Sequence, residues 1–194
     1  MNTKVQSQLI ASIQESIAVK QAMLARMVDA IETASEWLIE TLRGGHKVLL
    51  FGNGGSAADA QHVAAELIGR FEKKRRAWPA IALTTDTSVL TALANDEGLD
   101  IVFARQIEAL GEAGDLVLAF STSGNSRNVL EGVKTARAKG LRIIGLTGES
   151  GGKLAPLCDL ALRVPSQRTA RIQEAHITIC HLLCEVVEAA LQQS

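Results

Sequence analysis

The sequence predicts an α/β protein: a doubly wound, five-stranded parallel sheet with helical extensions at both ends. Three observations support this fold class. Short apolar segments alternate with helical segments between residues 47 and 164, as successive βαβ units require. The apolar segments are continuous rather than alternating with polar residues, which is typical of parallel strands covered on both faces. Long amphipathic segments precede the first strand and follow the last one.

Two amphipathic helices are expected before the sheet, between Val5 and about Leu42. Apolar residues such as Ile13 and Ile17 recur there at helical spacing. Gly44-Gly45 is expected to end the second helix, because glycine is the residue that most often terminates helices. The apolar stripes of both helices must be buried against the domain or against another subunit.

The middle of the chain is expected to supply the sheet and the helices that cover it. Strands are predicted at Lys47–Phe51, Ala80–Thr84, Asp115–Phe120, Arg142–Thr147 and Asp159–Val164. Helices are predicted at Ser56–Phe71, Ser88–Ala94, Asp100–Gly111 and Ser126–Lys139, with a short turn at Gly152–Leu157. A largely apolar final helix is predicted from about Thr169 to Leu191 and should be covered on most sides.

These elements are interpreted as a single domain, residues 1–194. It comprises N-terminal helices (1–44), an α/β core (45–166) and a C-terminal helix (167–194). In such folds ligands bind beyond the carboxyl ends of the strands.

Composition excludes several classes of protein. The chain has 194 residues, of which 47% are apolar and 21% charged, and a net charge of −1. It therefore has no general attraction for polyanions, and with four Phe, two Trp and no Tyr it has few surfaces for stacking nucleic-acid bases. No run of about 18 uncharged apolar residues and no signal-peptide pattern occurs, so we expect a cytoplasmic protein without a membrane segment. Cys158, Cys180 and Cys184 are expected to act as small buried hydrophobes.

The stretch from Val48 to Glu66 carries the first candidate site. A glycine-rich turn over residues 52–56 follows the first strand and leads into a helix N-terminus, which favours anions through its unpaired N–H groups. On that helix His62 and Glu66 lie four residues apart and share a face. The spacing suits two ligands of one zinc ion, and it also suits a simple surface hydrogen bond.

A second candidate site follows the third strand. Ser121-Thr122-Ser123-Gly124-Asn125-Ser126 places hydroxyls around a glycine, just before a helix. Such a turn predicts a phosphate site, and the alternative is an ordinary helix cap and turn. Neither turn matches the nucleotide P-loop or the dinucleotide fingerprint.

Polar residues interrupt two other parts of the chain. Gln173, His176 and His181 lie within the apolar final helix and need hydrogen-bond partners there. His176 is interpreted equally well as a core histidine with its hydrogen bonds satisfied. The basic pair Arg75-Arg76 is expected to belong to a solvated loop.

Taken in order, these motifs resemble the phosphoheptose isomerases, a family of the sugar-isomerase (SIS) group with a flavodoxin-like fold. The resemblance covers nearly the whole chain. It rests on Phe51–His62 with Glu66, on Ser121–Ser126, on Thr147-Gly148 and Gly151-Gly152, and on Arg171–His176 with His181. One departure is Ala170, where some members of the family carry an Asp that contacts the substrate.

The resemblance implies conversion of sedoheptulose 7-phosphate to D-glycero-D-manno-heptose 7-phosphate through an enediol. This is the first step toward the ADP- or GDP-heptoses of bacterial surface polysaccharides such as lipopolysaccharide. It further implies a homotetramer with active sites at subunit interfaces, and neither nucleic acid nor membrane as a partner.

The resemblance also implies roles for individual residues. Glu66 would be the general base and His181 the general acid. One zinc ion per subunit would be held by His62, Glu66, Gln173 and His181. The sugar phosphate would be contacted by Asn53, Gly54, Ser56, Arg70, Asp96, Ser121, Thr122, Ser123, Ser126 and Gln173.

Two questions stay open at this point. Gln173 and His181 are eight residues apart, about 12 Å along a straight helix, which is far for one ion. Either the helix begins later or bends near Gln173, or the two residues serve different copies of the site. The alternative function is that of the SIS proteins that bind the bacterial replication initiator as non-catalytic assembly factors. That group lacks counterparts of Glu66 and His181, which favours the isomerase.

Overall fold

A computed structural model describes residues 3–192 of the chain. Within these residues five parallel strands form a single sheet in the order β2-β1-β3-β4-β5. The strands are β1 (Val48–Phe51), β2 (Ala80–Ala82), β3 (Leu116–Ser121), β4 (Arg142–Thr147) and β5 (Leu160–Arg163). The predicted doubly wound parallel sheet is confirmed.

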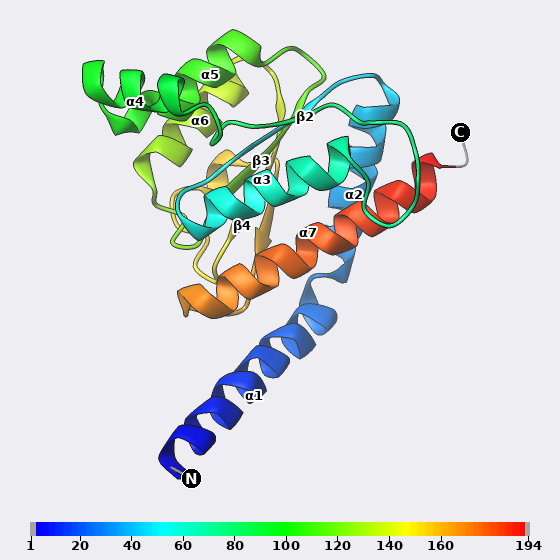
Figure 1. Cartoon of the computed structure of the whole chain (residues 1–194), viewed down its shortest axis with the longest axis vertical. Helices are drawn as coiled ribbons and strands as arrows, with labels where there is room; N and C mark the ends of the chain where they lie inside the picture. The colour runs from blue at the N-terminus through cyan, green and yellow to red at the C-terminus, as the bar shows by residue number, and fades with distance from the viewer. Residues whose placement is uncertain (1–2, 193–194) are drawn as a thin grey trace.

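Helices lie on both faces of the sheet (Figure 1). One face is covered by α2 (Val28–Arg43), α3 (Gly55–Ile68) and α7 (Thr169–Leu191), and the other by α4 (Thr87–Asp96), α5 (Val102–Leu110) and α6 (Arg127–Ala138). Short 3-10 turns occupy η1 (Leu99–Ile101) and η2 (Ala155–Leu157).

The two cores explain why the strands are continuously apolar. Val48 and Leu50 of β1 face the core beneath α2, α3 and α7, while Leu49 and Phe51 face the core beneath α5 and α6. All four side chains are fully buried. A strand buried on both faces has no position at which a polar residue would reach water.

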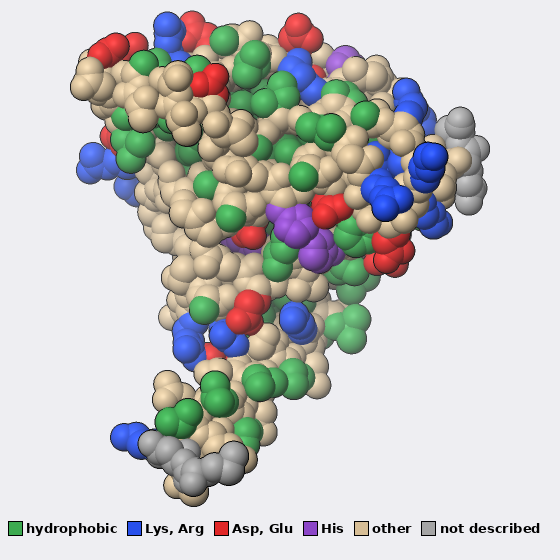
Figure 2. Space-filling model, in the orientation of Figure 1, with side chains coloured by type: hydrophobic (Ala, Val, Ile, Leu, Met, Phe, Trp, Pro, Cys, Tyr) green, Lys and Arg blue, Asp and Glu red, His purple; other side chains and the backbone are tan. Residues whose placement is uncertain are grey.

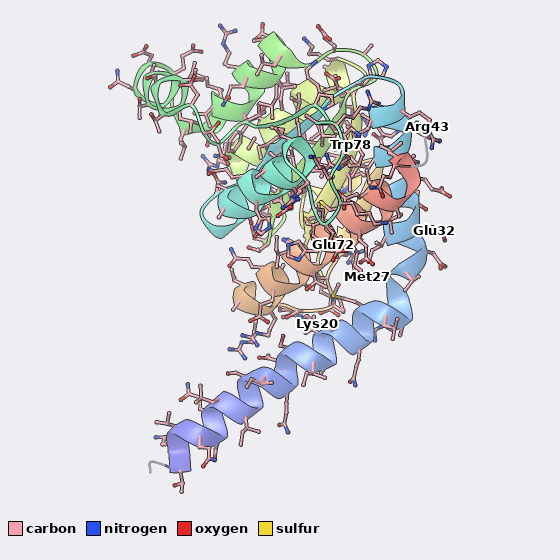
Figure 3. The ribbon with its side chains drawn as sticks, turned by 45° about the vertical axis from the view of Figure 1, so that its right-hand side comes forward. Lys20, Met27, Glu32, Arg43, Glu72 and Trp78 are labelled. Carbon is pink, nitrogen blue, oxygen red and sulfur yellow. The ribbon has the colours of Figure 1, made fainter. Side chains whose placement is uncertain are left out.

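The N-terminal extension consists of two helices, as predicted. Helix α1 (Thr3–Arg26) projects from the body of the molecule and meets α2 at Met27 (Figures 1 and 3). The backbone of Met27 leaves the helical region at φ −123°, yet its N–H still donates to the Met23 carbonyl at 2.8 Å. The junction is therefore a kink rather than a loop, and the buried side chain of Met27 packs within it.

Helices α3 and α7 lie side by side and run in the same direction (Figure 1). Gly55 at the start of α3 faces Gln173 near the start of α7, and His62 faces His181 further along both helices. Helix α7 buries one broad face, while Leu182 and Val186 on its other side stay about 40% exposed. None of the helices among residues 3–192 combines the length and apolar character that crossing a membrane requires.

Candidate active site

The two predicted ligand turns lie next to each other at the carboxyl end of the sheet. β1 and β3 are neighbouring strands, so the glycine turn after β1 and the Ser/Thr turn after β3 occupy the point where the strand order reverses. Gly52 makes this proximity possible. A Cβ atom at Gly52 would lie 3.0 Å from the Phe120 carbonyl oxygen and 2.8 Å from the Ser56 Cβ, so a larger residue would force the turns apart.

A reciprocal pair of amide side chains joins the glycine turn to helix α6. The Asn53 and Asn128 side chains each donate to the other's Oδ1 at 2.8 Å. The Oδ1 of Asn128 also accepts the Val129 N–H at 3.0 Å. Sequence reasoning missed Asn128. Its place near the start of a helix suggests capping, and nothing local indicates a partner 75 residues away.

In the Ser/Thr turn, the Ser126 hydroxyl does not cap the helix that follows. Ser126 occupies the N-cap position of α6, but its side chain makes no cap hydrogen bond. Its Oγ instead lies 3.1 Å from the Oγ of Ser121. The ordinary-cap alternative therefore does not describe Ser126. The ordinary-turn alternative does describe Ser123, whose Oγ accepts the Asn125 N–H at 3.1 Å.

Two pockets open beside these turns. One, of about 190 Å³, is lined by Asn53, Gly54 and Asn128 on its polar side and by residues including Leu99 and Phe103 on its apolar side. The other, of about 360 Å³, lies against Thr122, Ser123 and Gly148 and reaches Gln167. The two pockets share no lining residue, and neither is lined by His62, Glu66 or His181.

The candidate catalytic residues meet where α3 and α7 lie side by side. His62 Nε2 lies 3.1 Å from Glu66 Oε1 and 3.3 Å from His181 Nε2. The His62 side chain is 45% exposed and that of Glu66 24%. Histidine side chains gather next to acidic ones on this face of the molecule (Figure 2). The structure thus brings together three residues that the sequence placed on two separate helices.

The donor chemistry of this cluster fits a zinc ion. His62 Nε2 lies near both Glu66 and His181. It carries either one proton or one lone pair in the plane of the ring, so it can form a good hydrogen bond with only one of them. Two ligands of a tetrahedral zinc at the usual Zn–N distance are about 3.3 Å apart, close to the separations seen here. As the side chains stand, however, no three His, Cys, Asp or Glu donors within residues 3–192 are arranged to hold an ion.

Gln173 lies near the start of α7, against the start of α3. Helix α7 is continuous from Thr169, so the alternative in which it begins after Gln173 is wrong. The Gln173 amide packs against Gly55, where a Cβ atom would come within 2.5 Å of its Nε2. Gly55 and His62 are seven residues apart on α3, about 10 Å along the helix. That Gln173 and His181 hold the same ion stays a prediction.

Three further predicted residues, Ser56, Arg70 and Asp96, have different surroundings. Ser56 is buried beneath the glycine turn, and Arg70 is exposed immediately after α3. Asp96 is exposed at the end of α4 and accepts a hydrogen bond from Asn95 at 2.7 Å. In the part of the chain that the structure describes, no hydrogen bond joins Arg70 or Asp96 to the two turns.

His176 belongs to the core and not to the site. Its ring is fully buried, with Nε2 3.2 Å from the Thr147 carbonyl oxygen. Nδ1 has no hydrogen-bond partner, so the interpretation as a satisfied core histidine is right for one nitrogen and wrong for the other. Burial lowers the pKa of His176 to about 4, an effect that the hydrogen bond with Thr147 opposes.

The expectation of a solvated loop at Arg75-Arg76 is wrong for Arg75. Its side chain is only 4% exposed and lies 2.9 Å from the carboxylate of Glu188 on α7. A run of consecutive charged residues indicated a surface loop, but one of the side chains turns inward.

Comparisons with known proteins agree on the family. The SIS domain model matches residues 13–148. A phosphoheptose isomerase of Geobacter sulfurreducens is 52% identical over 183 residues, which span 94% of this chain and 97% of the relative.

Two solved structures share the fold of nearly the whole chain. A phosphoheptose isomerase of Neisseria gonorrhoeae has a TM-score of 0.91 and 46% identity, covering 95% of this chain and 99% of its own. One of Francisella tularensis has a TM-score of 0.92 and 38% identity, covering 97% of this chain and 100% of its own.

Proposed function

Because the chain belongs to the phosphoheptose isomerases of the SIS-domain family, we propose that its site interconverts sedoheptulose 7-phosphate and D-glycero-D-manno-heptose 7-phosphate. The observation that carries this proposal is the meeting of Glu66 with His62 and His181, two of them on α3, the helix that follows the glycine turn. The reaction is the first step toward activated heptoses for surface polysaccharide. No observation favours an initiator-binding assembly factor.

The isomerisation needs one group that moves a proton between carbons and another that serves the oxygens. Glu66 accepts a proton from C1 of the ketose, leaving an enediol, and returns a proton to C2. His181 donates a proton to the C2 oxygen and accepts one from the C1 hydroxyl. The proton on carbon moves by one position and the double bond to oxygen moves in the opposite direction, so the atoms balance.

The remaining predicted residues would hold the substrate. Ser121, Thr122, Ser123 and Ser126 bind the phosphate, whose remote binding energy helps to position the reacting carbons. Asn53, Gly54 and Ser56 bind sugar hydroxyls from the glycine turn. Arg70, Asp96 and Gln173 complete the contacts, and the exposure of Arg70 and Asp96 leaves room for a neighbouring subunit at the site.

We also propose a zinc ion for each subunit. His62, Glu66, Gln173 and His181 would hold it, and a bound zinc would stabilise negative charge on the substrate oxygens. The imidazole and carboxylate donors that converge from α3 and α7 support this assignment.

A homotetramer that works in the cytoplasm completes the proposal. Helix α1 supports the assembly, because several of its apolar side chains are exposed although they lie on a helix of regular amphipathic spacing. The polar, unanchored character of the substrate supports the location.

The test is to incubate the purified protein with sedoheptulose 7-phosphate, with and without added zinc, and to follow the aldose by NMR. Glu66→Gln should lower turnover by about a hundredfold or more, because it removes the base with little change of shape. Its thermal stability should stay close to that of the unmodified protein. No aldose from the unmodified protein, or near-normal turnover in Glu66→Gln, would refute the assignment.

A further inference from the structure

A buried carboxylate near the end of α7 accepts several hydrogen bonds from the loop that follows α3. Glu188 is 2% exposed. Its two oxygens accept the backbone N–H groups of Phe71, Glu72 and Lys73 at 3.1, 2.8 and 2.7 Å, and the Nε–H of Arg75 at 2.9 Å. All four donors belong to the α3–β2 loop (residues 69–79), which passes beside α7 (Figure 3).

The guanidinium of Arg75 connects this carboxylate to the end of α3. It donates to the Glu66 carbonyl at 2.6 Å and to the Leu67 carbonyl at 2.9 Å. Carbonyl groups in the last turn of a helix have no partner within the helix. The guanidinium also lies 3.5 Å above the ring of Trp78. Arg75 therefore holds the backbone of Glu66 itself.

Stability alone does not account for this pair. Removing two charges from water carries a desolvation cost, and apolar residues of similar volume often serve a core as well or better. Burial raises the pKa of Glu188, but the hydrogen bonds from Glu72, Lys73, Phe71 and Arg75 lower it by more, so the pKa lies below its ordinary value. The charged, fully bonded form fixes both oxygens in one orientation.

The position of Glu188 links it to the candidate catalytic residues. Glu188 and His181 are seven residues apart on α7, two turns that bring them to the same face. A chain of contacts thus runs from the helix of His181, through Glu188 and Arg75, to the backbone of Glu66. It runs parallel to the direct contact of His181 with His62. Neither Glu188 nor Arg75 lines the two pockets beside the turns.

We infer that Arg75 and Glu188 are positioning residues that hold Glu66 in register with His181. The inference rests on the proposed function, since it assigns to this pair the placement of the base against the acid. Neither side chain touches the substrate. An error of placement of about 1 Å can lower turnover by a hundredfold, so loosening the end of α3 should affect kcat more than KM.

The test compares Glu188→Gln with a matched control, Asp115→Asn. Asp115 is also a buried carboxylate, and it accepts the N–H groups of Lys47 and Glu112 and pairs with the Lys47 ammonium at 2.7 Å. It lies before β3, at the amino end of the sheet and away from the site. Each variant replaces a carboxylate oxygen, which accepts hydrogen bonds from the surrounding N–H groups, with an NH₂ group, which cannot accept them. Both should therefore lower the melting temperature.

Only Glu188→Gln should lower kcat, by about tenfold or more with KM within about threefold. Assays are run below the melting transitions of all variants. If Glu188→Gln fails to fold, Arg75→Lys decides by the same criterion, because its single ammonium group cannot reach Glu188 and the α3 carbonyls together. A kcat within twofold of the unmodified protein in the folded variant overturns the inference.

A second readout separates this inference from the proposed function. The side-chain NMR resonances of His62 and His181 should shift in Glu188→Gln and stay unchanged in Asp115→Asn, whether or not the protein turns over the heptose phosphate. Unmoved resonances refute the positioning role. An unmodified protein that makes no aldose refutes the proposed function, while a shift of these resonances still supports the positioning role.

Discussion

Burial of the His176 ring makes the stability of the protein depend on pH. The folded state holds this imidazole at a pKa of about 4 because it is buried, whereas the unfolded chain would titrate near 6.5. Well above pH 6.5 the imidazole of His176 is neutral in both the folded and the unfolded state, so it does not make stability depend on pH there. Between pH 6.5 and 4 the unfolded state binds the proton first, so the folded state loses stability as the pH falls.

We therefore expect His176→Gln to reduce the loss of stability at acidic pH. The amide does not titrate but can still donate to the Thr147 carbonyl. From the two pKa values, the unmodified protein should lose about 3 kcal/mol more than the variant between pH 7 and pH 4. Urea unfolding at several pH values measures the difference, with pH 8 as the baseline. Equal losses in the two proteins would show that His176 does not titrate in this way.

Individual residues also mark the limit of what the sequence could predict. His62 and Glu66 are four residues apart on one helix, and their shared face follows from helical geometry. The approach of His181, 119 residues further along the chain, depends on how α3 and α7 pack. The burial of Arg75 could not be predicted for the same reason, because its side chain points inward to pair with Glu188 and its charged neighbours in sequence do not indicate this.

At the scale of elements, the sequence predicted the sheet well because buried parallel strands are apolar at every position. β4 begins and ends where predicted, β1 begins one residue later than predicted, and β3 begins and ends one residue later. β2 is two residues shorter than predicted. Apolar periodicity reports local structure but carries no information on which helices lie side by side. The parallel alignment of α3 with α7 had to come from the structure.

The pair of amides between the glycine turn and α6 should act as one unit. Asn53→Ala or Asn128→Ala removes both reciprocal hydrogen bonds, so either change should raise KM for the sugar phosphate by about tenfold. The double variant should be little worse than either single one, with a coupling of about 1 kcal/mol.

A matched cycle provides the control for this prediction. Gln61 lies on α3 and bonds to Thr84 rather than to Asn53. Asn53→Ala and Gln61→Ala should therefore combine additively. Additive effects of Asn53→Ala and Asn128→Ala would show that the glycine turn and α6 are not coupled through this pair.

At the scale of the whole molecule, helix α1 exposes a surface that one chain cannot cover. Val19 and Met23 are buried against the body of the protein, but Ile13 and Ile17 are 61% and 50% exposed. These two residues follow helical spacing on a side of α1 that faces away from α7. Exposed apolar stripes of this kind usually mark contacts between proteins, and the proposed tetramer would cover this one.

Ile17→Glu should therefore disrupt the assembly, because it places a charge within the stripe. Light scattering coupled to gel filtration should show a mass below that of four chains, whereas circular dichroism should show the helix content of the unmodified protein. Ala18→Glu is the matched control, since Ala18 is the next residue, is also exposed and lies about 100° around the helix. If subunits complete each other's sites, turnover should fall together with the mass. An unchanged mass in Ile17→Glu would show that this stripe is not part of the interface. A dissociated but fully active protein would show that the whole site lies within one chain.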